Sequence, residues 1–205
     1  MSDDKKVVVD RCRRVVDLVL AVPGAILALP LLVATAVAVR LRMGSPVLFR
    51  QERAGQDGRP FMLVKFRTMT TRAGTSFDPQ DDAARLTPFG ARLRSTSLDE
   101  LPQLWNVLTG DMALVGPRPL PVAYVLRYTP RQRRRLLVRP GITGLAQVSG
   151  RNDLPWEDKF DLDADYVAHR SVRADLAILG RTAAAVVRRD GIGFDGQATM
   201  SEFRG

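Results

Sequence analysis

The sequence has very few of the side chains that most often carry catalysis or bind metals. Its 205 residues include one cysteine, Cys12, and one histidine, His169. A single cysteine excludes a disulfide framework, a zinc ribbon or an iron–sulfur cluster built from this chain alone. A single histidine excludes multi-histidine metal sites and leaves little scope for serine–histidine catalysis. Chemistry must therefore come from carboxylates, Lys and Arg, hydroxyls, backbone amides or a metal held by carboxylates.

Acidic residues are also scarce relative to basic ones, 22 against 31, so the net charge is +9. Only four of the basic residues are lysines, and 27 are arginines. A surplus of this size favours anionic partners, such as nucleic acid, phosphorylated small molecules or anionic membrane lipids. Arginine binds phosphate in a bidentate manner, but a GC-rich genome would enrich it without any function. The charge alone leaves these explanations open.

One long apolar run occupies residues 15–39, with Asp17 and Thr35 as its polar interruptions. A helix of this length reaches about 37 Å and could cross a bilayer once. Basic residues flank the run on both sides, and the positive-inside rule places both flanks in the cytoplasm. Pro30, near the middle, can break a helix. We therefore predict that residues 1–43 form a proline-broken re-entrant hairpin, and a kinked single span is the alternative.

Residues 44–205 contain no second run long enough to span a membrane, and we expect one cytoplasmic catalytic domain there. The hydrophobic spacing predicts a small β-hairpin followed by helices, over residues 46–66, 98–108, 121–137 and 159–190, the last interrupted near Ser171. Several of these helices carry arginines beside an apolar face, which suits the headgroup zone of a membrane. The predicted fold is mixed and mainly α-helical, with interfacial amphipathic helices on a monotopic membrane protein.

Two adjacent carboxylates, Asp99 and Glu100, lie in the segment RSTSLDELPQLW. Pro102 fits the first turn of a helix, which places both carboxylates at a helix N-terminus, where backbone amides and the dipole favour anions. Such a pair can divide the work between an ionised nucleophile and a group that holds a divalent metal or relays a proton. Ser97 and Glu100 also fit a capping box that needs no catalysis, and the spacing leaves both explanations open.

Cationic side chains recur beside turn-forming residues, and rigid turns that present arginine suit a diphosphate and its leaving group. They are Lys65 and Arg67 in KFRTM, Arg94 before the carboxylates, Arg118 in GPRP and Arg151 in GRN. Each alone fits a solvated surface residue. Together with the net charge and the carboxylate pair, they favour phosphoryl chemistry on a diphosphate. The glycine patterns of the common nucleotide-binding loops are missing.

These segments together resemble the monotopic polyprenyl-phosphate phosphoglycosyl transferases, also called bacterial sugar transferases, in their small single-domain form. The matching segments cover most of residues 11–190 in order: PVLFRQERAG (46–55), PFMLVKFRTM (60–69), RLRSTSLDELPQLWNVLTGDMALVGPRPLP (92–121), VRPGITGLAQVSGRN (138–152) and WEDKF (156–160), with Asp163 and Tyr166-Val167. The series SLDELPQLWNVL, GDM and GPRP is highly specific to that family.

The resemblance implies transfer of a phosphosugar from a UDP-sugar to polyprenyl (undecaprenyl) phosphate with release of UMP, the first membrane step of glycoconjugate assembly. It implies a ping-pong mechanism in which Asp99 is the nucleophile and forms an aspartyl-phosphosugar intermediate. Glu100 is then the catalytic partner and a ligand of Mg²⁺. The implied phosphate and substrate contacts are Lys65, Arg94, Arg118, Arg151, Asn152 and Asp163.

The resemblance also implies a location on the cytoplasmic face of the bacterial inner membrane, with Leu29-Pro30 where the family often has Ser-Pro. The expected partners are the UDP-sugar, polyprenyl phosphate and anionic membrane lipid, without nucleic acid, and a homodimer is left open. Residues 191–205 resemble an extension of members that act on N-acetylated deoxyamino sugars, which favours a UDP-N-acetylamino sugar. A membrane-tethered nucleic-acid binder and an inactive scaffold are the rival hypotheses.

Overall fold

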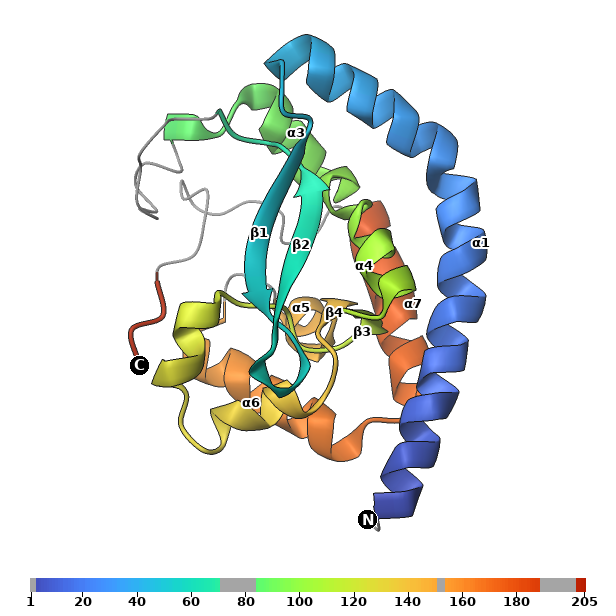
Figure 1. The fold of residues 1–205 in the computed structure, drawn as a ribbon, viewed down its shortest axis with the longest axis vertical. Helices are drawn as coiled ribbons and strands as arrows, with labels where there is room; N and C mark the ends of the chain where they lie inside the picture. Colours follow the sequence, from blue (N-terminus) through green and yellow to red (C-terminus); the bar gives the residue numbers. More distant parts are fainter. Residues whose placement is uncertain (1–2, 71–83, 151–153, 189–201) are drawn as a thin grey trace.

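The computed structural model describes residues 3–70, 84–150, 154–188 and 202–205, and a long N-terminal helix lies along one side of the remaining elements (Figure 1). In chain order these are α1 (Asp3–Met43), β1 (Leu48–Ala54), η1 (Gln56–Gly58), β2 (Pro60–Phe66), α3 (Pro88–Ser95), η2 (Leu98–Glu100), α4 (Gln103–Thr109), β3 (Ala113–Val115), η3 (Val122–Arg127), η4 (Gln132–Leu137), β4 (Gly141–Thr143), α5 (Leu145–Ser149), α6 (Trp156–His169) and α7 (Val172–Arg188), where η denotes a 3₁₀-helix. The described part of the chain is mainly helical, as predicted, and it contains a parallel pair β3–β4 that was not predicted, in addition to the hairpin.

The predicted β-hairpin is confirmed. Strands β1 and β2 pair antiparallel, in a register that places Phe49 opposite Lys65 and Arg53 opposite Phe61. Because side chains alternate along a strand, one face of the hairpin carries residues 49, 51 and 53 beside 61, 63 and 65. On this face, which we call the covered face, Leu63 is buried and the other five residues are half-buried, whereas residues 50, 52 and 62 on the other face are exposed. The covered face therefore includes a lysine and an arginine among its apolar residues.

Helix α1 is continuous through Pro23 and Pro30, so the break expected at Pro30 is not seen as an interruption of the helix. Both prolines are exposed on the side away from the rest of the protein, and they lie seven residues, about two turns, apart. A proline bends a helix away from its own side, so the two bends add. As a result, α1 curves over the domain instead of folding into two antiparallel arms (Figure 1).

The two sides of α1 meet different surroundings. Its buried positions recur at intervals of four along the side facing the domain, at Arg13, Asp17 and Ala21 and again at Thr35 and Val39. The outer side exposes many large apolar side chains, including Val15, Val19, Leu20, Val22, Ile26, Leu27, Leu29, Leu31, Val33, Val37 and Leu41. An exposed apolar surface of this extent marks contact with lipid or with another protein.

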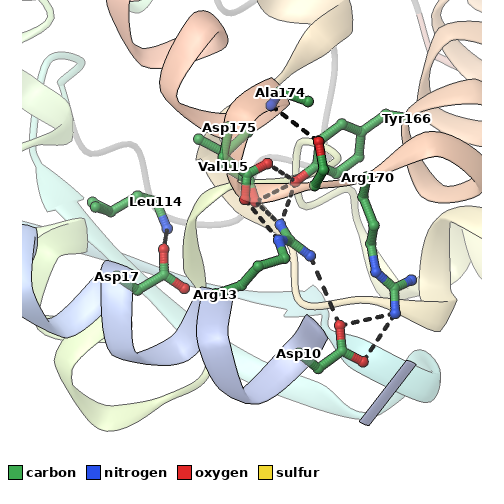
Figure 2. Close-up of polar contacts among 10 residues, drawn as sticks. Asp10, Arg13, Asp17, Leu114, Val115, Tyr166, Arg170, Ala174 and Asp175 are labelled. Atoms are coloured by element: carbon green, nitrogen blue, oxygen red, sulfur yellow. Dashed lines mark hydrogen bonds and ion pairs between the residues drawn. The ribbon is translucent and has the colours of Figure 1, made fainter. Parts of the chain in front are cut away.

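Arg13 anchors the first half of α1 to the domain (Figure 2). Its Nε atom donates to Asp175 Oδ2 of α7 at 2.6 Å, and its Nη2 atom donates to the hydroxyl of Tyr166 and, at 3.1 Å, to the carbonyl of Val115. One turn further on, the Asp17 carboxylate accepts from the backbone N–H of Leu114 at 3.0 Å. These side chains are buried, so the anchor is a fully paired polar network inside an otherwise apolar contact.

Two further arginines join α1 to the domain through backbone carbonyls. Arg14 donates to the carbonyls of Val107 (2.6 Å) and Leu108 (3.0 Å) at the end of α4. Arg67, which follows β2, donates to the carbonyls of Met43, Gly44 and Ser45. A guanidinium at the carbonyl end of a helix satisfies groups that have no partner within the helix. Arg67 therefore caps the C-terminal end of α1, whereas the sequence analysis placed it among the phosphate-binding candidates.

The structure corrects the helix predicted over residues 121–137 and confirms the predicted interruption near Ser171. Residues 121–137 form two 3₁₀ segments, η3 and η4, instead of one helix. The aromatic rings of this part pack together around Phe203, which explains the tight, irregular path: Tyr124, Tyr128, Trp156 and Phe160. The predicted interruption near Ser171 is confirmed, because α6 ends at His169 and α7 begins at Val172.

Replacing Arg13 by methionine should lower the free energy of unfolding by about 3–5 kcal/mol, because Asp175 would remain buried without its partner. Chemical unfolding of the protein in detergent micelles measures this. Arg11→Met provides the control, since it removes the same charge from an exposed position two residues away. Equal stabilities of the two variants would contradict the anchoring role of Arg13.

Candidate active site

Asp99 and Glu100 lie on η2, between α3 and α4, and a strained turn precedes them. Ser97 adopts a left-handed conformation with φ 55°, which is uncommon for a residue other than glycine. Its side chain makes no capping hydrogen bond, so the capping box that the spacing allowed is not formed. Backbone strain of this kind persists where the surrounding structure enforces it and is enriched at functional sites.

The Asp99 carboxylate is buried, with 5% of the residue exposed. Burial raises its pKa above the usual range, and the neighbouring Glu100 acts in the same direction. Three cations oppose this effect: Lys65 from β2, Arg94 from α3 and Arg118 from the loop after β3. The structure therefore brings together five residues that lie up to 53 positions apart in the sequence, four of them around one carboxylate.

Lys65 is a partly desolvated cation. Burial and the nearby Arg94 lower its pKa to about 8, and its Nζ atom lies 5.2 Å from the centroid of the Phe49 ring. An ammonium group in such surroundings has lost part of its hydration, so a phosphate can replace the missing water at low cost. Lys65 remains mostly protonated at pH 7, because its pKa stays above that value.

Arg94 and Arg118 are oriented by different partners. Arg94 Nε donates to Thr68 Oγ1 at 3.0 Å. Arg118 Nη2 donates to Glu100 Oε1 at 2.9 Å, and this ion pair raises the pKa of Arg118. Both members of the pair are partly open to solvent, the Arg118 side chain by 54% and the Glu100 side chain by 22%. The partly exposed Arg118–Glu100 pair therefore lies next to the buried Asp99.

The position of Arg118 depends on two glycine-containing motifs that lie against each other. Strands β3 and β4 pair in parallel, and a Cβ atom on Gly141 would lie 2.1 Å from the backbone nitrogen of Gly116. Gly116 N–H donates to the carbonyl of Thr143 at 2.8 Å, and Gly141 N–H donates to that of Pro117 at 3.0 Å. The GPRP and PGITG motifs therefore form one unit in which no larger residue fits at the contact.

Asp163 contributes to the site through this unit. It is buried in an ion pair with Arg135, whose Nη2 atom lies 2.9 Å from Asp163 Oδ2 and also donates to the carbonyl of Arg118 at 2.7 Å. The structure thus places Asp163 behind the backbone of Arg118, and its polar contacts there run through Arg135. Arg135, which lies in the arginine run 133–135, is not among the site residues expected from the sequence.

Asn106 is a second residue whose role the sequence did not indicate. Its Nδ2 atom donates to the carbonyl of Met62 at 2.8 Å, and its Oδ1 atom accepts from Val64 N–H at 3.2 Å. These bonds attach α4 to the free edge of β2, one residue before Lys65. The occurrence of Asn106 in the apolar surroundings of QLWNVL was the available signal. Arg151 and Asn152 lie outside the described residues.

The carboxylates are suited to a hard divalent cation. Within the described ranges, no group of three or more His, Cys, Asp or Glu side chains could hold a metal on its own. Mg²⁺, however, is commonly bound by one or two carboxylates together with water and substrate phosphates. The oxygen donors of Asp99 and Glu100, next to cations that suit phosphate, fit such a shared site. Glu100 is the more exposed of the two and is therefore the better candidate ligand.

Comparison with known proteins identifies one family model and several relatives, all of them sugar transferases. Residues 8–189 match the bacterial sugar transferase family. The chain is 49% identical over 171 residues to the uncharacterized sugar transferase EpsL of Bacillus subtilis, and the match covers 83% of this chain and 85% of that protein. It is 41% identical over 197 residues to the UDP-glucose:undecaprenyl-phosphate glucose-1-phosphate transferase of Caulobacter vibrioides, and the match covers 90% of this chain and 73% of that protein.

A third relative is longer. The chain is 40% identical over 197 residues to the UDP-galactose-lipid carrier transferase of Erwinia amylovora, and the match covers 87% of this chain but 41% of that protein. The chain thus spans about two fifths of the length of this relative.

Replacing Asp99 by asparagine should make the protein more stable at pH 7, by about 1 kcal/mol. Because the pKa of Asp99 is raised on folding, the ionised carboxylate destabilises the folded state at neutral pH. This penalty disappears as the pH falls below the unfolded value of about 4.

Unfolding curves of wild type and D99N between pH 3 and pH 8 measure this difference. The control is Asp57→Asn, an exposed turn position with φ 57° that asparagine tolerates. The explanation is wrong if D99N is less stable than wild type at pH 7.

Proposed function

The chain belongs to the bacterial sugar transferase family, and from this membership and the site geometry we propose that it transfers a phosphosugar from a UDP-sugar to polyprenyl phosphate and releases UMP. The observation that carries the proposal is the buried Asp99 carboxylate, surrounded by Lys65, Arg94 and Arg118. The names of the Caulobacter and Erwinia relatives describe sugar transfer to lipid carriers, and the same chemistry accounts for these residues here.

In the proposed first half-reaction, a carboxylate oxygen of Asp99 attacks the β-phosphorus of the UDP-sugar. The bond from the β-phosphorus to the bridging oxygen breaks, and its electron pair leaves with UMP. The surrounding cations offset the negative charge that develops on the phosphate oxygens, as preorganised donors do in other phosphoryl transfers. The raised pKa of Asp99 corresponds to a more basic and therefore more nucleophilic carboxylate.

In the second half-reaction, an oxygen of polyprenyl phosphate attacks the phosphorus of the aspartyl intermediate. The phosphorus–carboxylate bond breaks, the product is a polyprenyl diphosphosugar, and Asp99 is again a free carboxylate. Splitting the transfer into two steps lets a water-soluble donor and a lipid acceptor use one site in turn. Burial of Asp99 also protects the intermediate from water.

We propose that Glu100 holds Mg²⁺ when the donor is bound. The ion would supply Lewis-acid stabilisation of the phosphate oxygens. In the structure, Glu100 is paired with Arg118. Both partners are partly exposed, so Arg118 can leave Glu100 and pair with a phosphate instead, which frees the Glu100 carboxylate for the metal.

We further propose that α1 enters the cytoplasmic leaflet of the bacterial inner membrane and returns, so that the site faces the cytoplasm. The buried residues Arg13, Asp17 and Ala21 hold the first half of α1 to the domain, and Thr35 and Val39 hold the second half, whereas a free membrane span is surrounded by lipid along its length. The curvature at Pro23 and Pro30 and the exposed apolar outer face support shallow insertion. This arrangement brings Asp99 close to the surface from which a polyprenyl phosphate is presented.

The proposed sugar is a UDP-N-acetylamino sugar, on the basis of the C-terminal segment, of which residues 191–201 lie outside the described residues. The relatives above are named for glucose and galactose. The choice of sugar therefore has to be measured directly.

A panel of UDP-sugars, incubated with undecaprenyl phosphate and the detergent-purified protein, should release UMP with a UDP-N-acetylamino sugar as the fastest donor. D99N should reduce the rate at least a thousandfold, since it removes the nucleophile while the fold is kept. D57N provides the matched control and should retain the wild-type rate. If D99N keeps wild-type turnover, or if no UDP-sugar yields UMP, the proposed reaction is wrong.

A further inference from the structure

Arg53 is a second cation on the covered face of the β-hairpin. It lies on the same face of the hairpin as Lys65. The residue opposite Arg53 is Phe61 of β2, which is four positions, or roughly 13 Å, from Lys65 along that strand. Covered faces of hairpins are normally apolar, and a half-buried arginine there requires a partner or a function. Lys65 has such a function in the proposed reaction, whereas Arg53 is not used by any step described above.

The guanidinium of Arg53 is incompletely satisfied. Its Nη2 atom donates to Gln51 Oε1 at 2.5 Å. Its Nε atom is buried and has no hydrogen-bond partner. No carboxylate pairs with it anywhere in the described part of the chain. A buried N–H donor without an acceptor costs free energy unless a ligand supplies the acceptor.

Arg53 also lies next to Arg118. The N–H of Ala54 donates to the carbonyl of Leu120 at 3.0 Å, which joins the end of β1 to the GPRP loop. Burial and the charge of Arg118 together lower the pKa of Arg53 to about 10, so it stays charged at pH 7. The phenol groups of Tyr124 and Tyr128 are the other neighbours, and neither neutralises it. Arg53 therefore has a like charge nearby and a buried donor without an acceptor, and a bound anion would offset both.

We propose that Arg53 binds the phosphate of the nucleotide leaving group, the α-phosphate of the UDP-sugar and then of UMP. This inference rests on the proposed function. Lys65 and Arg94 lie beside Asp99, where the β-phosphate is attacked. Arg118 lies close enough to both Asp99 and Arg53 to influence the pKa of each. In the proposed complex, the α-phosphate next to the attacked β-phosphate lies on the Arg118 side of Asp99, where the guanidinium of Arg53 binds it.

The test compares Arg53→Gln and Arg53→Lys with Arg50→Gln as the matched control. Arg50 is on the same strand but exposed on the opposite face. The dissociation constant of UMP is measured by calorimetry on the full chain in detergent, and the thermal midpoint is recorded for each variant. The burst of UMP released from the best UDP-sugar without acceptor gives the rate of the donor half-reaction, and steady-state release of UMP with undecaprenyl phosphate present gives KM for each substrate.

R53Q should weaken UMP binding about tenfold to a hundredfold and raise the donor KM by a similar factor. R53K should recover part of the loss, because it restores the charge but not the bidentate fork. R50Q should bind UMP as wild type does.

Two outcomes would overturn the proposal. If R53Q lowers the thermal midpoint but binds UMP within twofold of wild type, Arg53 is structural. If R53Q leaves the donor half-reaction unchanged and raises the KM for undecaprenyl phosphate, Arg53 belongs to the acceptor site. Failure of the proposed function is distinguishable, since wild type itself would then release no UMP from any UDP-sugar.

Discussion

A carboxylate held out of water among cations places the strongest constraint on this protein. Burial and Glu100 raise the pKa of Asp99, whereas Lys65, Arg94 and Arg118, which come from a strand, a helix and a loop, oppose this rise. Their convergence cannot be local, because it needs the packing of several elements. Asn106 fixes the strand that carries Lys65, and the contact of the two glycine motifs fixes the loop that carries Arg118. These interior contacts therefore hold Lys65 and Arg118 near Asp99.

The apolar helix α1 is held to the domain that carries Asp99. Arginines and Asp17 of α1, and Arg67 from the domain, bind the two units through buried ion pairs and backbone groups, while the outer side of α1 stays apolar. A flexible tether would leave the distance between site and membrane undefined. A helix anchored near both ends gives the domain a fixed orientation, which a reaction between a soluble donor and a lipid acceptor requires.

The sequence predicted those features that depend on local patterns. The β-hairpin and the interruption near Ser171 were predictable from periodicity and turn residues, and the family-specific motifs contain the residues that the structure brings together around Asp99. The continuous curve of α1 was not, because a proline removes one hydrogen bond and bends the helix, but packing against the domain decides whether it also breaks. The indirect role of Asp163 depends on long-range packing, and so does the position of Arg53 beside Arg118. No pattern within one segment encodes either relation.

The covalent step can be tested most directly by intact-protein and peptide mass spectrometry. The purified protein is incubated with the preferred UDP-sugar and no acceptor, then quenched in acid. The account predicts an added mass equal to the phosphosugar, located on the peptide that contains Asp99, and its loss when undecaprenyl phosphate is supplied. UMP release that requires the acceptor, with no adduct on Asp99 at any time, would contradict it.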